Sequence, residues 1–433
     1  MASTIRFYME QSVPELEDLE RKGLFDKREI TMIMRRRTDF EHRILGRGSQ
    51  PRDFLKYSDF EINLERLRIK RFQRLHKTEL VDAKPSISDW AGFRKIIFVF
   101  DRAVRRYPAN LELWLKFLQF VKEKDAIKIV YRVYAKLLLL QPRNVEAWLS
   151  AAKYEFETNA NAKGARDLYQ RALKLNPESS KLWLSYAQFE LAYVSKLLAR
   201  RKVMGLLTEK QQEEDLQAQA SDFQSRLAKV PAENGTEGED AAAINNDVIA
   251  FDDDNEDEIK EQLALLPEAD MNILGNPDLN PVLKGDIALT VFDVSIPELL
   301  KGVAQESRES RLFELAEQYL EVFSKFENLN RDYLNYHVVS YLQNTHGSNP
   351  RTVMLDITLP LRNVKVSDSN LAEALQLSVN KYMAYKLKTR SATEKVALAA
   401  QYVAFLNAEY VNCEEEKSER TVQLLRAIIQ KCQ

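Results

Sequence analysis

The chain has 433 residues, of which 45% are apolar and 30% charged, and its formal net charge is −2. Such a composition allows a large buried core, while 12 glycines, 13 prolines and the lack of alternating strand-like runs favour an all-helical protein. No uncharged apolar run approaches the ~18 residues of a membrane span, and the first residues lack the apolar core of a signal peptide. Two cysteines form no disulfide framework and indicate a reducing compartment.

Charge is distributed unevenly along the chain. Residues 1–207 carry 41 Lys and Arg against 26 Asp and Glu, a net charge of +15, whereas residues 208–270 carry 4 against 19, a net charge of −15. A basic front half of this kind predicts an anionic partner.

Residues 12–45 predict two helices separated at Gly23. Ser12-Val13-Pro14-Glu15 has the pattern of a capping box with proline in the first turn. A basic triplet, Arg35, Arg36 and Arg37, follows near the end of this region. Such triplets commonly form a solvated helix face, and the alternative is a nuclear-import or RNA contact.

The next stretch has the spacing of a helical repeat that recurs further along the chain. Phe54, Tyr57, Phe60 and Glu61 take the positions of a first helix, and a strongly basic second helix is expected after them. Its cations could bind phosphates irrespective of base sequence, or dock on an acidic protein. They are Arg66, Arg68, Lys70, Arg71 and Arg74.

Between residues 90 and 204 the repeat occurs three times. Pro108, Pro142 and Pro177 each stand six residues before a tryptophan, with periods of 34 and 35 residues, which indicates stacked helical hairpins. Asn110, Asn144 and Ser179 are expected helix N-caps. All four tryptophans, Trp90 included, are expected in the core. The predicted repeat core is Trp114, Phe120, Tyr134, Trp148, Tyr154, Tyr169, Trp183 and Phe189.

Details of the unit distinguish it from the common tetratricopeptide repeat. An aromatic residue follows the tryptophan at the sixth position, and Glu155 and Glu190 follow that residue in two units, with Val121 departing from the pattern. This resembles the half-a-tetratricopeptide (HAT) repeat, a family associated largely with RNA processing. The two glutamates are expected to be partly buried and bonded to a neighbouring helix.

Beyond the array, one long helix is predicted from Ser180 to Arg201. Between Lys229 and Lys260 there are eleven acidic and no basic residues, so 210–262 is expected to be a mobile linker. Asp252–Glu258 could alternatively dock a basic partner or mask the basic front. An extended stretch is expected over 266–285. Helices are expected over 286–295, 297–328 with breaks, 331–344, 369–388, 392–412 and 418–431. A second capping box is expected at Ser295–Glu298, and a degenerate repeat at Tyr402, Phe405, Ala408 and Glu409.

The predicted organisation is therefore an all-α, α-α superhelical solenoid of HAT repeats with an acidic disordered insert. Its parts are residues 1–80, an N-terminal helical region with a divergent HAT unit; 85–207, the HAT array; 208–262, the acidic flexible linker; and 263–433, a C-terminal helical, HAT-like region.

A closer resemblance lies in three N-terminal segments, 13–25, 36–42 and 54–61, with shorter ones at 200–207, 266–270 and 285–290. They are similar to the U3 small nucleolar RNA-associated protein 6 family. Members of this family are the HAT-repeat subunit of the UTP-B module of the small-subunit processome. The resemblance implies a nuclear, nucleolar scaffold that supports 18S rRNA maturation. It also implies contact with β-propeller (WD-repeat) subunits and with pre-ribosomal RNA and U3 RNA, without a membrane or small-molecule substrate.

Two alternatives remain open, a HAT scaffold of pre-mRNA splicing or mRNA 3′-end processing, and a peptide-binding solenoid without an RNA role. Catalysis is not expected, because the sequence lacks the motifs of metalloproteases, serine hydrolases and P-loop enzymes. The four histidines, His42, His76, His337 and His346, are scattered, and no metal or cofactor is expected.

Overall fold

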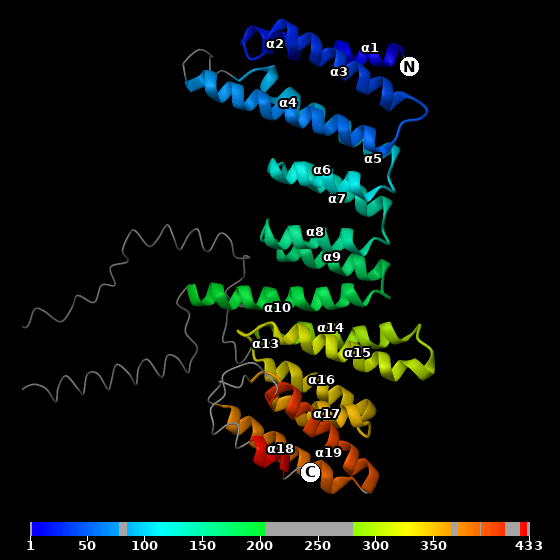
Figure 1. Ribbon diagram of the computed structural model, residues 1–433, viewed down its shortest axis with the longest axis vertical. Helices are drawn as coiled ribbons and strands as arrows, with labels where there is room; N and C mark the ends of the chain where they lie inside the picture. The colour runs from blue at the N-terminus through cyan, green and yellow to red at the C-terminus, as the bar shows by residue number, and fades with distance from the viewer. Residues whose placement is uncertain are drawn as a thin grey trace, which may run out of the picture. The chain divides into compact units, whose positions relative to one another are not determined.

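The computed structural model describes residues 2–77, 85–203, 280–364, 370–389, 391–411 and 425–430, and these residues form helices and no strand (Figure 1). The all-α prediction is confirmed. The chain divides into two compact units, residues 1–147 and 148–433, with the boundary inside helix α8 (Val145–Glu157).

Unit 1 is a series of helices in which, from α2 onward, each packs on the next. Helix α3 packs on α4, α4 on α5, α5 on α6 and α6 on α7, while α2 also packs on α5 and α1 on α3. Short connections make the consecutive helices antiparallel neighbours (Figure 1). Their bounds are α1 (Ala2–Glu10), α2 (Val13–Arg21), α3 (Lys27–Leu45), α4 (Pro51–Lys77), α5 (Ile87–Arg106), α6 (Leu111–Glu123) and α7 (Ile127–Leu140). The first helix, α1, was not predicted.

The predicted break at Gly23 is present, but the capping box before it is not. Gly23 adopts φ +63°, and the Leu24 amide donates to the Leu19 carbonyl at 3.0 Å, which closes α2 in the left-handed manner that glycine favours. Ser12 has helical backbone angles, and its hydroxyl donates to the Tyr8 carbonyl at 3.0 Å instead of capping α2. The capping-box prediction was wrong because Glu15 turns inward to an arginine of α3.

Helix α4 corrects a second prediction. The basic residues at 66–74 do not form a second helix, because α4 continues unbroken from Pro51 to Lys77. They are the C-terminal half of the first helix, and α5 is its partner. Gly92 allows the two helices to lie close, since a Cβ at this position would clash with the Glu65 carboxylate.

The proline-to-tryptophan spacing has a direct structural cause. The Trp114 indole N–H donates to the Pro108 carbonyl at 2.9 Å, and the Trp183 indole repeats this bond to Pro177 at 2.9 Å. The indole therefore satisfies a carbonyl where the chain turns between helices. Each predicted core residue is at most 8% exposed: Trp114, Phe120, Tyr134, Trp148, Tyr154, Tyr169, Trp183 and Phe189. Trp90 was wrongly placed among them, because it is 47% exposed.

A stacked pair of rings recurs at a fixed separation of 17 residues. Phe40 stacks on Tyr57 with centroids 5.1 Å apart, Phe100 on Phe117 at 5.1 Å, and Tyr169 on Tyr186 at 5.4 Å. Each pair joins the second helix of one hairpin to the first helix of the next. The recurrence includes Tyr57, so the divergent unit around Phe54 has the same internal geometry as the tryptophan units.

Unit 2 joins segments that lie far apart in the sequence. Helix α10, predicted as one long helix, packs on α13, α14 and α15. The predicted linker 208–262 and most of the extended stretch 266–285 lie outside the described residues. The described end of that stretch, residues 281–284, is helical. The bounds are α9 (Ala162–Leu175), α10 (Ser180–Val203), α13 (Pro281–Lys284), α14 (Asp286–Leu300), α15 (Gln305–Ser324), α16 (Arg331–His346), α17 (Pro350–Thr358), η1 (Leu359–Leu361), α18 (Leu371–Lys388), α19 (Ala392–Leu406) and η2 (Asn407–Val411).

The second predicted capping box is also absent. Helix α14 runs through Pro297, and the buried Ser295 hydroxyl donates to the Phe292 carbonyl at 2.9 Å and accepts from the Tyr319 hydroxyl at 2.8 Å. Ser295 is therefore a buried link between α14 and α15. Helix α17 was not predicted.

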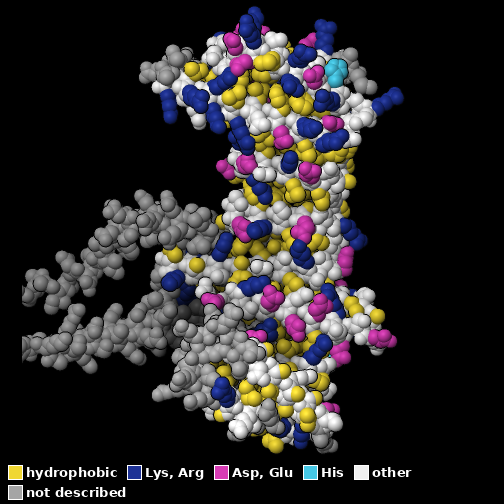
Figure 2. Space-filling model, in the orientation of Figure 1, with side chains coloured by type: hydrophobic (Ala, Val, Ile, Leu, Met, Phe, Trp, Pro, Cys, Tyr) yellow, Lys and Arg dark blue, Asp and Glu magenta, His cyan; other side chains and the backbone are white. Residues whose placement is uncertain are grey.

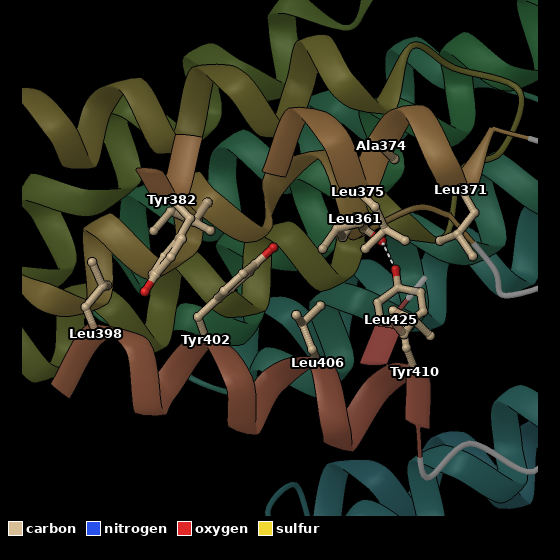
Figure 3. Close-up of a cluster of buried hydrophobic side chains, with 11 residues drawn as sticks. Leu361, Leu371, Ala374, Leu375, Tyr382, Leu398, Tyr402, Leu406, Tyr410 and Leu425 are labelled. Atoms are coloured by element: carbon tan, nitrogen blue, oxygen red, sulfur yellow. Dashed lines mark hydrogen bonds between the residues drawn. The ribbon is translucent and has the colours of Figure 1, made fainter. Parts of the chain in front are cut away.

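The last helices enclose a core of their own (Figure 3). Tyr382 and Tyr402 stack with centroids 4.9 Å apart, and the Tyr410 hydroxyl donates to the Leu361 carbonyl at 2.8 Å (Figure 3). The predicted repeat register was wrong here, because Tyr402, Leu406 and Tyr410 are buried whereas Ala408 and Glu409 are exposed. Of the helix predicted over 418–431, residues 425–430 are described, and they are helical.

Candidate interaction surface of the N-terminal unit

The basic half of α4 divides into two faces, and the inner face is neutralised within the unit. Arg68 is 8% exposed and donates to Glu65 at 2.7 Å and to Asp89 at 3.0 Å. Arg71 donates to both carboxylate oxygens of Glu29, at 2.7 and 2.8 Å. Because Arg71 holds the carboxylate by these bonds, the pKa of Glu29 falls to about 2. Arg68 and Arg71 thus fix α4 in place and are not available to a partner.

The outer face of α4 carries the three remaining predicted cations. Arg66, Lys70 and Arg74 are exposed and follow one another at four-residue spacing, so they form one row along the helix. Arg66 lies 3.8 Å from Glu123 with its side chain 61% exposed, a geometry that contributes little stability. Lys70 and Arg74 make no ion pair with any described residue. We call Arg66, Lys70 and Arg74 the outer basic row.

The arginine triplet of α3 also divides between surface and core. Arg35 and Arg36 are exposed, whereas Arg37 is 0% exposed and donates to Glu61 at 2.8 and 2.9 Å and to Glu15 at 3.1 Å. Arg37 cannot contact RNA in the folded unit, which corrects the prediction for this residue. Burial lowers the pKa of Arg37, but the charges of Glu61 and Glu15 outweigh it and raise the pKa overall.

Lysine 95 completes this buried charge cluster. Its Nζ lies 3.4 Å from Glu15. Burial raises the pKa of Glu15, but the charges of Arg37 and Lys95 lower this pKa by more, so the carboxylate stays charged. A buried ion pair of this kind is costly to break, because the surviving charge loses its partner. The cluster therefore joins α2, α3, α4 and α5.

The glutamate that closes the HAT pattern is bonded as predicted. Glu190 is 1% exposed and accepts two bonds of 2.7 Å from Arg166 of α9, the preceding helix. Glu155 is 6% exposed and accepts from the Asn161 amide at 3.4 Å. These carboxylates hold the repeat together and are not placed to act on a ligand.

The internal ion-pair partners were missed from the sequence, although one signal was present. Arg37 lies 24 residues before Glu61, and Arg166 lies 24 residues before Glu190. A search for a cation at that offset from each predicted repeat glutamate would have found both. The contacts of Arg68 and Arg71 with Asp89 and Glu29 follow no such offset.

Figure 2 shows hydrophobic side chains interspersed with lysines and arginines on the face it presents. No group of His, Cys, Asp and Glu among the described residues has the arrangement of a metal site. Within the same residues, every helix is too short or too polar to cross a membrane. What the described residues do form is a row of exposed cations on a helix that ion pairs hold in place.

Comparison with known proteins gives two family matches. Residues 9–95 match the family model described as U3 small nucleolar RNA-associated protein 6, and residues 98–231 match that of the PRP39 N-terminal HAT repeat. The first match contains α2, α3, α4 and the outer basic row. The second contains the array of tryptophan hairpins, which agrees with the HAT prediction.

Curated relatives share the first of these descriptions. Over 204 residues the chain is 38% identical to U3 small nucleolar RNA-associated protein 6 of Schizosaccharomyces pombe, covering 47% of this chain and 41% of that protein. It is 30% identical over 169 residues to the mouse homolog, covering 39% and 28%, and 27% identical over 210 residues to the Dictyostelium discoideum homolog, covering 48% and 34%. The matches thus span less than half the length of each of these relatives.

Proposed function

Because the chain belongs to the U3 small nucleolar RNA-associated protein 6 family, we propose that it acts in ribosome biogenesis as a non-enzymatic scaffold associated with U3 small nucleolar RNA. The match over residues 9–95 carries this proposal, since the description of that family names U3 small nucleolar RNA. A scaffold role fits the helical-hairpin architecture, which presents long surfaces rather than an enclosed reaction site.

The finer form of the proposal places the chain in a UTP-B-like module of the small-subunit processome. There it would contact β-propeller (WD-repeat) subunits, act near pre-ribosomal RNA and support maturation of 18S rRNA in the nucleolus. Long exposed helices that hold several proteins and an RNA at once suit such a module.

The outer basic row supplies a physical basis for contact with RNA. Arg66, Lys70 and Arg74 project from a helix that the bonds of Arg68 and Arg71 to carboxylates of neighbouring elements hold in place. Phosphate binding by such a row is blind to base sequence and weakens with salt. Arg35 and Arg36 extend the exposed positive charge of the same unit.

One observation favours a second function. Residues 98–231 match the PRP39 N-terminal HAT repeat, so the array is also similar to a HAT protein of another description, and this favours the alternative of a HAT-repeat scaffold of pre-mRNA splicing or mRNA 3′-end processing. The two functions differ in the RNA with which the chain would associate. The RNA that co-purifies with the chain from cells therefore distinguishes them.

The test is purification of the tagged full chain from cells under conditions that preserve ribonucleoprotein particles. We expect recovery of U3 RNA and WD-repeat proteins far above that obtained with an untagged control strain. Enrichment of spliceosomal RNAs without U3 RNA would support the alternative, and enrichment of neither RNA would reject both.

A further inference from the structure

A groove of about 670 Å³ in unit 1 lies away from the outer basic row. Its lining comes from α1, α2, α5 and α7, with Glu41 and Tyr57 contributing from α3 and α4. Its volume is within the range of about 300 to 1,000 Å³ that is typical of ligand-binding clefts. Nothing in the family matches or the proposed function assigns a role to it.

One wall of the groove is an exposed apolar stripe on α5. Ile87 is 46% exposed, Trp90 47% and Phe98 41%. Trp90 lies three positions after Ile87 on the helix, and Phe98 lies eleven positions after Ile87. Trp90 differs from the other tryptophans of the chain, Trp114, Trp148 and Trp183, which are between 1% and 8% exposed. Met9 and Ile129 add further apolar surface to the lining. Large apolar side chains left together at a surface commonly mark a binding site.

The free charges of the groove are positive. Three acidic residues line it, but each is paired within the unit: Glu15 with Arg37, Glu41 with Arg102 at 2.7 Å, and Asp101 with Lys136 at 2.8 Å. By contrast, Arg94 and Arg132 line the groove and form no ion pair with any described residue. The Arg94 guanidinium lies 4.9 Å from the centre of the Trp90 ring, so cation and indole form one combined surface.

The groove also contains a hydroxyl without a partner. Tyr57 is 1% exposed, and its ring stacks on Phe40, while its hydroxyl makes no hydrogen bond to any described residue. Since Tyr57 lines the groove, this hydroxyl can donate to an acceptor that enters it.

We propose that this groove binds a peptide segment of a partner protein in which large apolar side chains are flanked by Asp or Glu. The apolar side chains would lie against Ile87, Trp90 and Phe98, and the carboxylates would pair with Arg94 and Arg132. A peptide carbonyl or carboxylate is the acceptor that suits the Tyr57 hydroxyl.

The lining favours a peptide over single-stranded RNA. Ile87, Met9 and Ile129 offer methyl groups that gain from covering apolar side chains, but they offer no flat ring for stacking a base. One face of the Trp90 ring is already covered by Arg94, and the Phe98 ring is contacted by Arg102 and by the Tyr8 ring. Only two unpaired arginines line the groove, so it lacks the continuous positive track that follows a nucleic-acid backbone.

The test is a selection of random 16-residue peptides displayed on phage against the immobilised full chain. A double variant, Trp90→Ser with Phe98→Ser, removes the apolar wall, and Met32→Ser serves as the matched control because Met32 is 62% exposed in the same unit and does not line the groove. Circular dichroism and thermal melting verify that both variants are folded. A 16-nucleotide oligouridine is measured against the same proteins by fluorescence anisotropy.

We expect the wild type and Met32→Ser to enrich peptides that combine Leu, Ile, Met or Phe with Asp and Glu. These peptides should lose at least tenfold in affinity on the double variant, and a similar amount on Arg94→Glu. Enrichment of basic peptides, or equal enrichment by wild type and double variant, would overturn the proposal. Oligouridine binding that is lost on the double variant would assign the groove to RNA instead. If the double variant is unfolded, Arg94→Glu, which changes an exposed side chain, decides the question alone.

Discussion

Arg37 and Glu61 form a buried pair, with two bonds of 2.8 and 2.9 Å, whose 24-residue separation recurs in Arg166 and Glu190. In each case a pair of stacked rings, 17 residues apart, lies between the arginine and the glutamate in the sequence. The rings are Phe40 and Tyr57 in the first case and Tyr169 and Tyr186 in the second. A cation, two rings and a carboxylate therefore form one recurring contact between consecutive hairpins. The divergent unit around Phe54 and the unit around Trp183 share it.

Removal of Arg37 tests this contact in the N-terminal unit. Arg37→Ala leaves Glu61 buried without its partner and Glu15 with Lys95 alone, so the free energy of unfolding should fall by about 3 to 5 kcal/mol. The control is Arg36→Ala, which removes an exposed neighbour and should change the free energy by less than about 0.5 kcal/mol. Urea unfolding of the full chain measures both, and equal small losses would contradict the buried pair.

The unit that departs from the HAT pattern provides a second test. Val121 replaces the glutamate, and the residue 24 positions before it is Ile97 rather than arginine. Val121→Glu should destabilise by about 3 kcal/mol or more, because Val121 is 0% exposed and the new charge would be unpaired. Adding Ile97→Arg should recover about 1 to 3 kcal/mol.

This double-mutant cycle is measured by urea unfolding of the two single variants and the double variant. Strictly additive losses would show that positions 97 and 121 do not face each other as Arg166 and Glu190 do.

The pH dependence of stability should report the pair of Arg71 and Glu29. The pKa of Glu29 is lowered from 4.5 to about 2, so its contribution is present above about pH 4.5 and is lost as the pH falls toward 2. At pH 7, Glu29→Gln should cost about 1 kcal/mol, a small value because this side chain is one-third exposed. Below pH 2 the difference between variant and wild type should vanish.

Thermal melting of the two proteins between pH 7 and pH 2 provides the measurement. A difference that stays constant over this range would show that the carboxylate charge is not the source of the stabilisation.

The sequence predicted the repeat core well because its signal is local. Pro108 and Trp114 are joined by a hydrogen bond over six residues at the start of one helix. The apolar face of each first helix is visible in the periodicity of its own residues. Long-range pairing is different: Asp89 lies 21 residues from Arg68, and Glu29 lies 42 residues from Arg71. The basic run could therefore not be divided into an inner and an outer face from the sequence. Ser12 and Ser295 were misread because each has a cap-like sequence but bonds within a helix.

The outer basic row should contribute to RNA binding without contributing to the fold. Replacing Arg66, Lys70 and Arg74 by Ala should leave the melting temperature within about 2 °C of the wild type, since the Arg66–Glu123 pair is exposed and Lys70 and Arg74 form no ion pair with any described residue. Binding of a single-stranded RNA should weaken, and its dependence on the logarithm of salt concentration should become shallower by about 2, as expected for three lost phosphate contacts.

The matched control for the row is Lys116→Ala with Lys153→Ala, which removes exposed cations from other helices. Equal losses of RNA affinity in both variants would mean that general positive charge, rather than the row, binds the RNA.

The most direct measurement of the central claim is depletion of the protein from cells, followed by mapping of ribosomal RNA precursors. A scaffold associated with U3 RNA predicts that precursors of the small-subunit RNA accumulate and that mature 18S rRNA falls, while the large-subunit RNA is retained, with recovery on re-expression of the wild type. Unchanged precursors together with retained introns in messenger RNA would contradict it.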